Sequence, residues 1–255
     1  MTGKVRPKKA LGQHFLTDRG IARKIVDALP LADRPVLEIG PGTGVLTSLL
    51  VTRPAPLHLI EIDRESVAFL RAAYPQLNDR LREGDFLEDG LGPLAGAECD
   101  IIGNFPYNIS SQLFFRILEH RQEVKTVVCM LQKEVAQRIA SPPGSKVYGI
   151  LSVLLQTWYR IEYLFNVPPG VFHPPPKVMS GVIRLTRNDR QTLECDEVFF
   201  QKVVKQAFQT RRKTLRNALK NLNLPDFSLE DPLGSLRAEQ LSVEDFIRLT
   251  RLLER

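Results

Sequence analysis

The chain has 255 residues, 43% of them hydrophobic and 25% charged, which suits a folded protein with a sizeable core and excludes a disordered or fibrous one. A formal net charge of +6 suits a nucleic-acid partner without demonstrating one. The three cysteines and four histidines are scattered, so we expect neither a disulfide framework nor a bound metal. No apolar run could span a membrane and no signal core follows the basic N-terminus, so we expect a cytoplasmic protein.

Strand-like and helix-like segments alternate through the first part of the chain. The apolar runs predict strands at 35–39, 57–63, 81–83, 99–104 and 124–131. Helices are expected over 45–52, 64–73, 111–120 and 132–140. This alternation predicts an α/β fold with a doubly wound, mostly parallel sheet.

Prolines punctuate the later part of the chain. Five of them fall between 168 and 176 and exclude a helix there. One more strand is expected over 177–185, followed by a polar, linker-like stretch over 186–195 and then short helices. We therefore predict a first domain of residues 1–187 and a small α-helical domain of residues 188–255.

Three glycines, Gly40, Gly42 and Gly44, follow the first of these strands. Small residues here let the backbone approach a ligand closely, although a simple tight turn between strand and helix explains them equally well. Their spacing differs from the Gly-x-Gly-x-x-Gly of dinucleotide enzymes, which argues against a pyrophosphate cradle.

Two acids follow the next strands in turn. Glu61 ends the second strand, about twenty residues after the glycines, where an acid accepts hydrogen bonds from ribose hydroxyls. Asp85 is placed to accept from an adenine amine, although alone it reads as a helix-starting acid. Together with the glycine loop they indicate an adenosine without phosphates, for which S-adenosylmethionine is the common cofactor.

The strand at 99–104 runs into Asn104, Phe105, Pro106 and Tyr107. An exocyclic adenine amine is a poor nucleophile because its lone pair is delocalised into the ring. The Asn104 oxygen and the Phe105 carbonyl can accept from its N–H groups and stabilise the charge that develops on nitrogen. Pro106 stiffens the turn, and Tyr107 offers a face for an unstacked base. The alternative is a strand-ending turn with a packed aromatic ring.

Five stretches carry a resemblance to a known family. They are KKALGQHFL (8–16), LEIGPGTGVLT (37–47), NFPYNIS (104–110), VPPGVFHPPPKVMSGVIRL (167–185) and RRKTLRNAL (211–219). The chain resembles the ribosomal RNA adenine N6-dimethyltransferases that modify the small subunit. It departs from the family at His14, Phe105 and Met179, where Asn, Leu and Asp are commoner.

The resemblance implies a Rossmann-like methyltransferase sheet and a set of site residues. Cofactor-binding residues would be His14, Leu16, Gly40, Gly42, Glu61, Asp85, Phe86 and Asn104. Catalytic residues would be Asn104, Phe105, Pro106, Tyr107 and Phe172, with the last ring sandwiching the target adenine opposite Tyr107. Nucleic-acid contacts would come from Arg211, Arg212, Lys213 and Arg216 along a C-terminal helix, although such a basic run is ordinarily a solvated helix face.

The implied reaction is N6,N6-dimethylation of two adjacent adenosines in the 3′-terminal hairpin of small-subunit ribosomal RNA, within a pre-30S particle, by a monomer with a role in ribosome biogenesis. Three alternatives stay open. They are a resistance methyltransferase acting on large-subunit RNA, a DNA adenine methyltransferase, and a binding-only assembly or transcription factor. The C-terminal RRKTLRN stretch argues against the first, the GQHFL opening against the second, and the intact Asn104, Pro106 and Tyr107 against the third.

Overall fold

The computed structural model describes residues 5–222 and 231–254. The chain divides into two compact units, Met1–Ala136 with Ile161–Arg187 and Gln137–Arg160 with Asn188–Arg255. One change of unit falls between Arg187 and Asn188. The segment Gln137–Arg160 belongs to the second unit, although the sequence alone placed it in the first domain. The division into domains of residues 1–187 and 188–255 stays a prediction.

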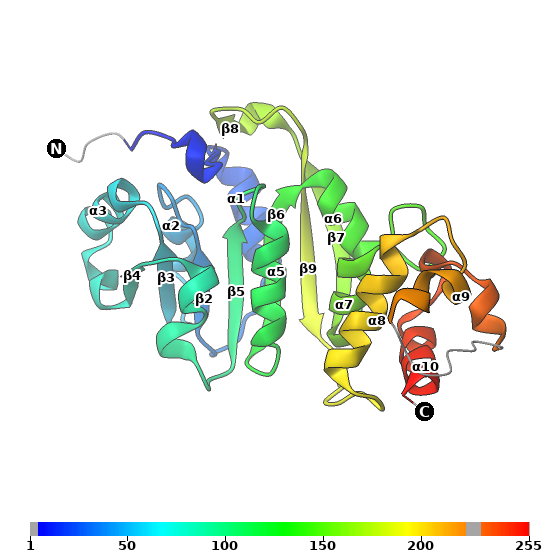
Figure 1. Ribbon diagram of the computed structural model, residues 1–255. Helices are drawn as coiled ribbons and strands as arrows, with labels where there is room; N and C mark the ends of the chain where they lie inside the picture. Colours follow the sequence, from blue (N-terminus) through cyan, green and yellow to red (C-terminus); the bar gives the residue numbers. More distant parts are fainter. Residues whose placement is uncertain (1–4, 223–230, 255) are drawn as a thin grey trace. The chain divides into compact units, whose positions relative to one another are not determined.

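A seven-stranded sheet organises the first unit (Figure 1). Its order is β4 (Leu81–Glu83), β3 (Leu57–Glu61), β2 (Val36–Ile39), β5 (Cys99–Asn104), β6 (Val124–Gln132), β9 (Ser180–Arg187) and β7 (Tyr159–Val167). The pairs from β4 to β6 are parallel, and β9 runs antiparallel to β6. The prediction of a doubly wound, mostly parallel sheet is therefore confirmed, and β7 is a strand that the sequence analysis did not predict.

Helices follow the strands in the expected alternation. They are α1 (Arg19–Asp27), α2 (Thr47–Leu50), α3 (Arg64–Ala73), α4 (Phe86–Asp89), α5 (Ser110–Glu119) and α6 (Lys133–Ala140), with 3-10 turns η1 (Lys9–Leu11), η2 (Pro75–Arg80) and η3 (Gly92–Leu94). Asp18, Asp63 and Asp85 begin α1, α3 and α4 by accepting a hydrogen bond from a first-turn N–H. The sequence analysis missed α1.

Residues on both faces of the sheet are buried in the core. Alternate strand residues such as Val36 and Leu37 point to opposite faces, yet both are buried. One face packs against apolar residues of α1, α2 and α3, including Ile25, Leu50 and Leu70. Burial on both faces produces the continuous apolar strands from which a parallel sheet could be recognised.

The strand order reverses between β2 and β5. From β2 the chain moves outward through β3 and β4, and then returns to the other side of β2 for β5 and β6. The carboxyl ends of strands beside such a reversal form a crevice. A ligand of this fold is therefore expected to bind in this crevice.

Two short segments form a separate two-stranded sheet. The strand β1 (Phe15–Leu16) pairs antiparallel with β8 (Phe172–His173), with Phe15 opposite His173 and Leu16 opposite Phe172. Before β8, Pro169–Val171 form one 3-10 turn, η4. The prolines exclude an α-helix as expected, but they allow this single tighter turn because Pro occupies its first positions.

The described residues of the second unit form helices and the turns between them, apart from the start of β7. It contains α7 (Ile150–Trp158), α8 (Glu197–Gln209), α9 (Leu215–Ala218) and α10 (Val243–Leu253), with η5 (Leu219–Leu222), η6 (Pro232–Ser235) and η7 (Ala238–Gln240). Its core includes Phe208, whose ring centroid lies 5.9 Å from that of Phe246 and 6.2 Å from that of Tyr148. The prediction of only short helices after Asp196 is wrong for α8, which has 13 residues.

Membrane-spanning helices and clusters of metal ligands are both absent from residues 5–222 and 231–254. Among these residues no helix has the length and apolar character needed to cross a membrane. Within the same ranges, no three His, Cys, Asp or Glu side chains are grouped so that they could hold a metal ion.

Candidate active site

One cavity of about 300 Å³ opens at the carboxyl ends of β2, β3, β4 and β5, on both sides of the reversal in strand order. The segment before β1 supplies another wall through Ala10, Gly12 and His14. The whole lining belongs to the first unit. Both the position and the size suit a small-molecule ligand of an open α/β sheet.

The glycine loop leaves the backbone bare where it borders this cavity. Gly40 and Gly42 line it with φ of 65° and 56°, values that side chains rarely adopt. A Cβ at Gly40 would meet no atom within 4 Å, so nothing separates this backbone from a ligand. Gly44 has a different role, because the Tyr74 hydroxyl donates to its carbonyl at 3.2 Å.

Glu61 joins the glycine loop to the turn after β3. Its Oε2 accepts from the Gly42 N–H and its Oε1 from the Asp63 N–H, both at 2.9 Å. Burial raises the pKa of this carboxyl, and the two N–H donors oppose that rise. Each oxygen keeps a second lone pair, so Glu61 can still accept from a ribose hydroxyl.

Glu38, two residues before Gly40, is buried beside the glycine loop. It is 2% exposed, and the Thr47 hydroxyl donates to its Oε2 at 2.7 Å. Burial raises the pKa of Glu38 to about 8, against the Thr47 hydrogen bond and with a further rise from the Glu61 charge. At neutral pH Glu38 is therefore mainly protonated, which avoids two buried negative charges in proximity.

Asp85 both lines the cavity and begins α4. Its Oδ1 accepts from the Leu87 N–H at 2.9 Å. Its Oδ2 has no hydrogen-bond partner in the described part of the chain, so the helix-starting role and a ligand-binding role are compatible. Phe86 also lines the cavity.

Ile62 also lines this cavity, and it was not predicted as a site residue. Its side chain is 49% exposed, unusual for a large apolar residue beside the buried Glu61. Such a surface suits the flat face of an adenine ring. The available signal was a large apolar residue directly after a strand-ending acid.

The Asn104 side chain is oriented by the segment before β1. Its Nδ2 donates to the His14 carbonyl oxygen at 2.8 Å. A carbonyl can only accept, so the amide nitrogen must face His14 and Oδ1 is left as an acceptor. Neither this Oδ1 nor the Phe105 carbonyl oxygen receives a hydrogen bond within residues 5–222 and 231–254.

Phe105 and Pro106 both line the cavity, but they contribute differently. The Phe105 N–H donates to the Met130 carbonyl at 2.9 Å, which extends the pairing of β5 with β6. Its ring is fully buried, edge-on to Phe114 with centroids 5.8 Å apart. A buried ring at this position anchors the turn and leaves only the backbone available to a substrate.

Tyr107 lines the cavity and is held from two directions. Its hydroxyl shares a hydrogen bond of 2.6 Å with the buried Ser180 hydroxyl. The His14 ring stacks against it with centroids 5.6 Å apart and planes at 27°, and His14 Nδ1 lies 2.7 Å from the Pro174 carbonyl. The imidazole thus occupies one face of the tyrosine ring.

Leu16 and Phe172 lie elsewhere. Neither lines the cavity; they are 3% and 4% exposed and belong to the core cluster of the first unit. The burial of both side chains follows from the pairing of β1 with β8, in which Leu16 lies opposite Phe172. Their roles toward cofactor and base stay predictions, and for Phe172 contact with a base would require its ring to leave the core.

The basic run of the second unit is a turn rather than the start of a helix. Arg211, Arg212 and Lys213 lie between α8 and α9, and only Arg216 falls inside α9. The Arg211 guanidinium donates to the carbonyls of Lys146 and Tyr148 at 2.9 and 3.1 Å. The expectation of one continuous helix is wrong because Thr214, in an extended conformation, precedes α9. Arg212 and Lys213 are exposed.

The residues around the cavity fit S-adenosylmethionine. The described lining holds two carboxylates, Glu61 and Asp85, and neither lysine nor arginine. This balance disfavours a phosphate-bearing ligand and favours one with positive charge. The bare backbone at Gly40 and the exposed face of Ile62 suit a flat nucleoside.

Comparison with known proteins also indicates a methyltransferase. The family model described as ribosomal RNA adenine dimethylase matches residues 5–254. Ribosomal RNA small subunit methyltransferase A of Porphyromonas gingivalis is 56% identical over 255 residues, covering 98% of this chain and 99% of that protein. The protein of the same name from Bacteroides thetaiotaomicron is 54% identical over 253 residues, covering 98% and 95%.

Solved structures agree over most of the chain. A dimethyladenosine transferase from Plasmodium falciparum superposes with a TM-score of 0.77 at 25% identity, covering 94% of this chain and 98% of that one. The 23S rRNA methyltransferase ErmE superposes with a TM-score of 0.66 at 25% identity, covering 94% and 100%. The chain is an S-adenosylmethionine-dependent methyltransferase and belongs to the ribosomal RNA adenine dimethylase family.

Proposed function

We propose that this enzyme dimethylates N6 of two adjacent adenosines in the 3′-terminal hairpin of small-subunit ribosomal RNA during assembly of the small subunit. The names of the relatives from P. gingivalis and B. thetaiotaomicron support the small subunit as the target. The hairpin and the pre-30S particle come from the sequence resemblance. A loop adenosine is also a reasonable substrate, because extruding an unpaired base disrupts less structure than opening a duplex pair.

The observation that carries the proposal is the orientation of Asn104. Because Nδ2 is committed to the His14 carbonyl, Oδ1 is the atom that can accept from an incoming amine. The Phe105 carbonyl is a second acceptor on the next residue. Two acceptors match the two N–H groups of an adenine N6 amine and stabilise the positive charge that develops on nitrogen.

The remaining residues position the two reactants. S-adenosylmethionine supplies a methyl group on a good leaving group, so no strong base is needed. Glu61, Asp85 and Gly40 would hold the nucleoside part, and Tyr107 would support the extruded base by stacking. Placement of this kind contributes most of the rate in a simple transfer. After one transfer the amine keeps one N–H, so a second methylation would rely on a single one of these acceptors.

RNA contact is proposed for the basic turn of the second unit. Arg212 and Lys213 are exposed there and are available for phosphate contacts. Arg211 already binds two carbonyls of the same unit. We keep Arg211 and Arg216 in the proposed RNA-binding set, with Arg211 also holding the turn. Monomeric state and cytoplasmic location stay predictions.

The test is to incubate unmodified small subunits, large-subunit RNA and DNA separately with the protein and methyl-labelled S-adenosylmethionine. The RNA or DNA is then digested and its labelled nucleosides are identified by mass spectrometry. We expect N6,N6-dimethyladenosine from small subunits alone, and none with the Asn104→Ala variant. Label confined to monomethyladenosine, large-subunit RNA or DNA would each contradict a different part of the proposal.

A further inference from the structure

The segment of residues 8–16, which we call the strap, forms one wall of the cavity. Its C-terminal end is fixed by the main chain, because β1 pairs with β8 and the Thr17 N–H donates to the Val171 carbonyl at 2.8 Å. Asn104 Nδ2 holds the middle through the His14 carbonyl. Leu16 is buried in the core. This end of the strap cannot move without disrupting the fold.

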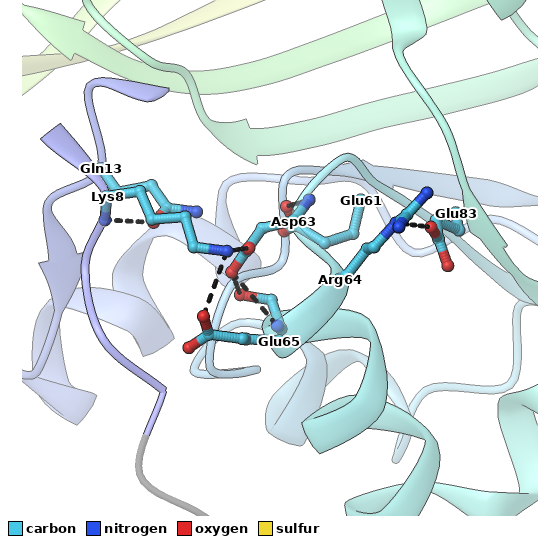
Figure 2. Close-up of polar contacts among 8 residues, drawn as sticks. Lys8, Gln13, Glu61, Asp63, Arg64, Glu65 and Glu83 are labelled. Carbon is cyan, nitrogen blue, oxygen red and sulfur yellow. Dashed lines mark hydrogen bonds and ion pairs between the residues drawn. The ribbon is translucent and has the colours of Figure 1, made fainter. Parts of the chain in front are cut away.

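At the N-terminal end of the strap, the Lys8 side chain makes the ion-pair contacts to the rest of the unit, and Val5, three residues earlier, is buried. Lys8 Nζ forms an ion pair with Asp63 Oδ1 and lies 3.2 Å from Glu65 Oε1, as Figure 2 shows. The Lys8 N–H donates to Gln13 Oε1 at 2.8 Å, which closes the strap on itself. In Figure 2 the lysine reaches from the N-terminal segment to the start of α3.

Asp63 is an unusual partner for a half-exposed lysine. Its side chain is fully buried, whereas that of Lys8 is 40% exposed. Its Oδ2 accepts from the Ser66 N–H and hydroxyl at 3.2 and 2.8 Å, and so begins α3. Burial alone would raise the pKa of Asp63, but the hydrogen bonds from Lys8 and Ser66 outweigh it and leave the pKa below its ordinary value. The partner of Lys8 is therefore a fixed negative charge.

The same aspartate also orients the proposed ribose acceptor. The Asp63 N–H donates to Glu61 Oε1 at 2.9 Å, and Glu61 Oε2 accepts from the Gly42 N–H. The strap is thus anchored two residues away from the carboxylate on which the cofactor would rest. A movement of the anchor changes the wall and the floor of the cavity together.

We propose that the Lys8–Asp63 ion pair is a latch that keeps the strap closed over the bound cofactor, and that the cofactor enters and leaves when this end opens. Lys8 is then a positioning residue, and the strength of its ion pair with Asp63 sets the residence time of the cofactor. The proposal rests on the cavity being the S-adenosylmethionine site. We place the opening at Lys8, because the β1 end is fixed by sheet bonds and core packing.

The test compares three variants of the full chain. Lys8→Met removes the ion pair and keeps the aliphatic stem. Lys8→Arg keeps the charge. Lys9→Met is the matched control, because Lys9 is an exposed neighbour in the same turn whose side chain pairs with no acid in the described part of the chain. Dissociation of S-adenosylmethionine is followed by stopped-flow displacement, and steady-state kinetics give KM for the cofactor and kcat.

We expect Lys8→Met to dissociate about twofold to fivefold faster, the upper part of the range for a partly exposed ion pair. KM for S-adenosylmethionine should rise accordingly, whereas kcat at saturating cofactor should not fall. Added salt should accelerate dissociation from the wild type more than from Lys8→Met, since salt screens an exposed pair. Lys8→Arg should recover most of the wild-type residence time, and Lys9→Met should match the wild type.

Hydrogen exchange provides a readout that needs no cofactor. The Leu11 and Gly12 N–H groups donate to the Lys8 and Lys9 carbonyls at 3.1 and 3.0 Å. In the cofactor-free protein these amides should exchange faster in Lys8→Met than in Lys9→Met. Unchanged exchange and unchanged residence time in Lys8→Met would refute the latch while leaving the cofactor site intact. Failure of the wild type to bind S-adenosylmethionine would instead overturn the cofactor site, and the latch with it.

Discussion

Asn104 Nδ2 donates a hydrogen bond of 2.8 Å to the His14 carbonyl, 90 positions earlier in the chain. This contact decides which atom of the amide remains as an acceptor. It also ties the proposed catalytic turn to the strap that borders the cofactor cavity. The orientation of the amide therefore depends on the end of the strap that stays fixed.

Asn104→Ala removes both the strap contact and the acceptor. We expect methyl transfer to fall about 100- to 1,000-fold, as when one positioned group is removed from a site that stabilises developing charge. Asn104→Asp should be as severe, because its carboxylate would face the His14 carbonyl without a proton to donate. Single-turnover methylation measures the effect. Transfer by either variant within about tenfold of the wild type would contradict the role of Asn104.

Glu61→Gln should weaken S-adenosylmethionine binding nearly as much as Glu61→Ala. Both carboxylate oxygens accept from N–H groups, those of Gly42 and Asp63, and an amide can satisfy only one of them. Loss of a charged hydrogen-bonding group should weaken binding by about 1.5–3 kcal/mol. Titration calorimetry gives the affinity, with thermal unfolding as the check that each variant is folded. Wild-type affinity in a folded Glu61→Ala protein would refute the assignment.

Tyr107 and Phe172 are predicted to hold the target base, and the structure allows this role to be separated from core packing. Tyr107→Ala should reduce methyl transfer by the loss of stacking, about 1–3 kcal/mol, whereas Tyr107→Phe loses only the Ser180 hydrogen bond. Phe172→Ala should lower the free energy of unfolding by about 3–5 kcal/mol, because its ring is buried.

The variant that separates the two roles of Phe172 is Phe172→Leu, which keeps most of the buried volume. If the ring also stacks on the base, methyl transfer should fall while stability changes little. Cofactor affinity serves as the control for all four variants and should stay near that of the wild type. Normal methylation by both Tyr107→Ala and Phe172→Leu would exclude the sandwich.

Arg212 and Lys213 should account for part of the salt dependence of RNA binding. Replacing both by Ala should reduce the slope of log affinity against log salt by about 0.7–0.9 for each phosphate that the variant no longer binds. Arg211→Ala should in addition lower the unfolding temperature, because the Lys146 and Tyr148 carbonyls lose their donor. Filter binding over a salt series measures the slope. An unaltered slope in the double variant would show that this turn is an ordinary solvated surface that does not contact RNA.

Glu38 predicts a pH dependence of stability. Its folded pKa of about 8 lies above the ordinary 4.5, so between these values the folded chain holds a proton that the unfolded chain has released. Its contribution to the free energy of unfolding therefore falls as pH rises through this window, by at most about 5 kcal/mol at about 1.4 kcal/mol per pKa unit. Glu38→Gln keeps the acceptor for Thr47 and should remove this dependence. Parallel urea unfolding curves at about pH 5 and pH 9, on either side of this window, provide the measurement.

The parallel sheet was predictable because its strands contain continuous apolar runs, such as residues 127–131, separated by segments with helical spacing. The strand Tyr159–Val167 was missed although apolar and polar residues alternate along it, a period-two pattern that is broken only at Leu164. The carboxyl-end positions of Glu61, Asp85 and Asn104 followed from strand order alone.

Contacts between residues far apart in the chain could not be predicted from the sequence. Whether Phe172 faces a cavity or the core depends on its pairing with Leu16, a two-residue bridge without a periodic signal. The Lys8–Asp63 pair joins residues 55 positions apart, and neither lysine nor aspartate is unusual in its own neighbourhood. Arg211 likewise looked like its basic neighbours until its carbonyl partners were known.

The two hydrogen bonds of Arg211 have a consequence for the RNA contact that we propose for Arg212 and Lys213. They fasten the turn that carries Arg212 and Lys213 to the Lys146 and Tyr148 carbonyls of the same unit before any RNA arrives. A backbone that is already ordered gives up less conformational entropy when its cations meet phosphates. The turn then presents its charges at a fixed spacing. Such a turn would bind a folded RNA with matching phosphate positions more tightly than a flexible strand.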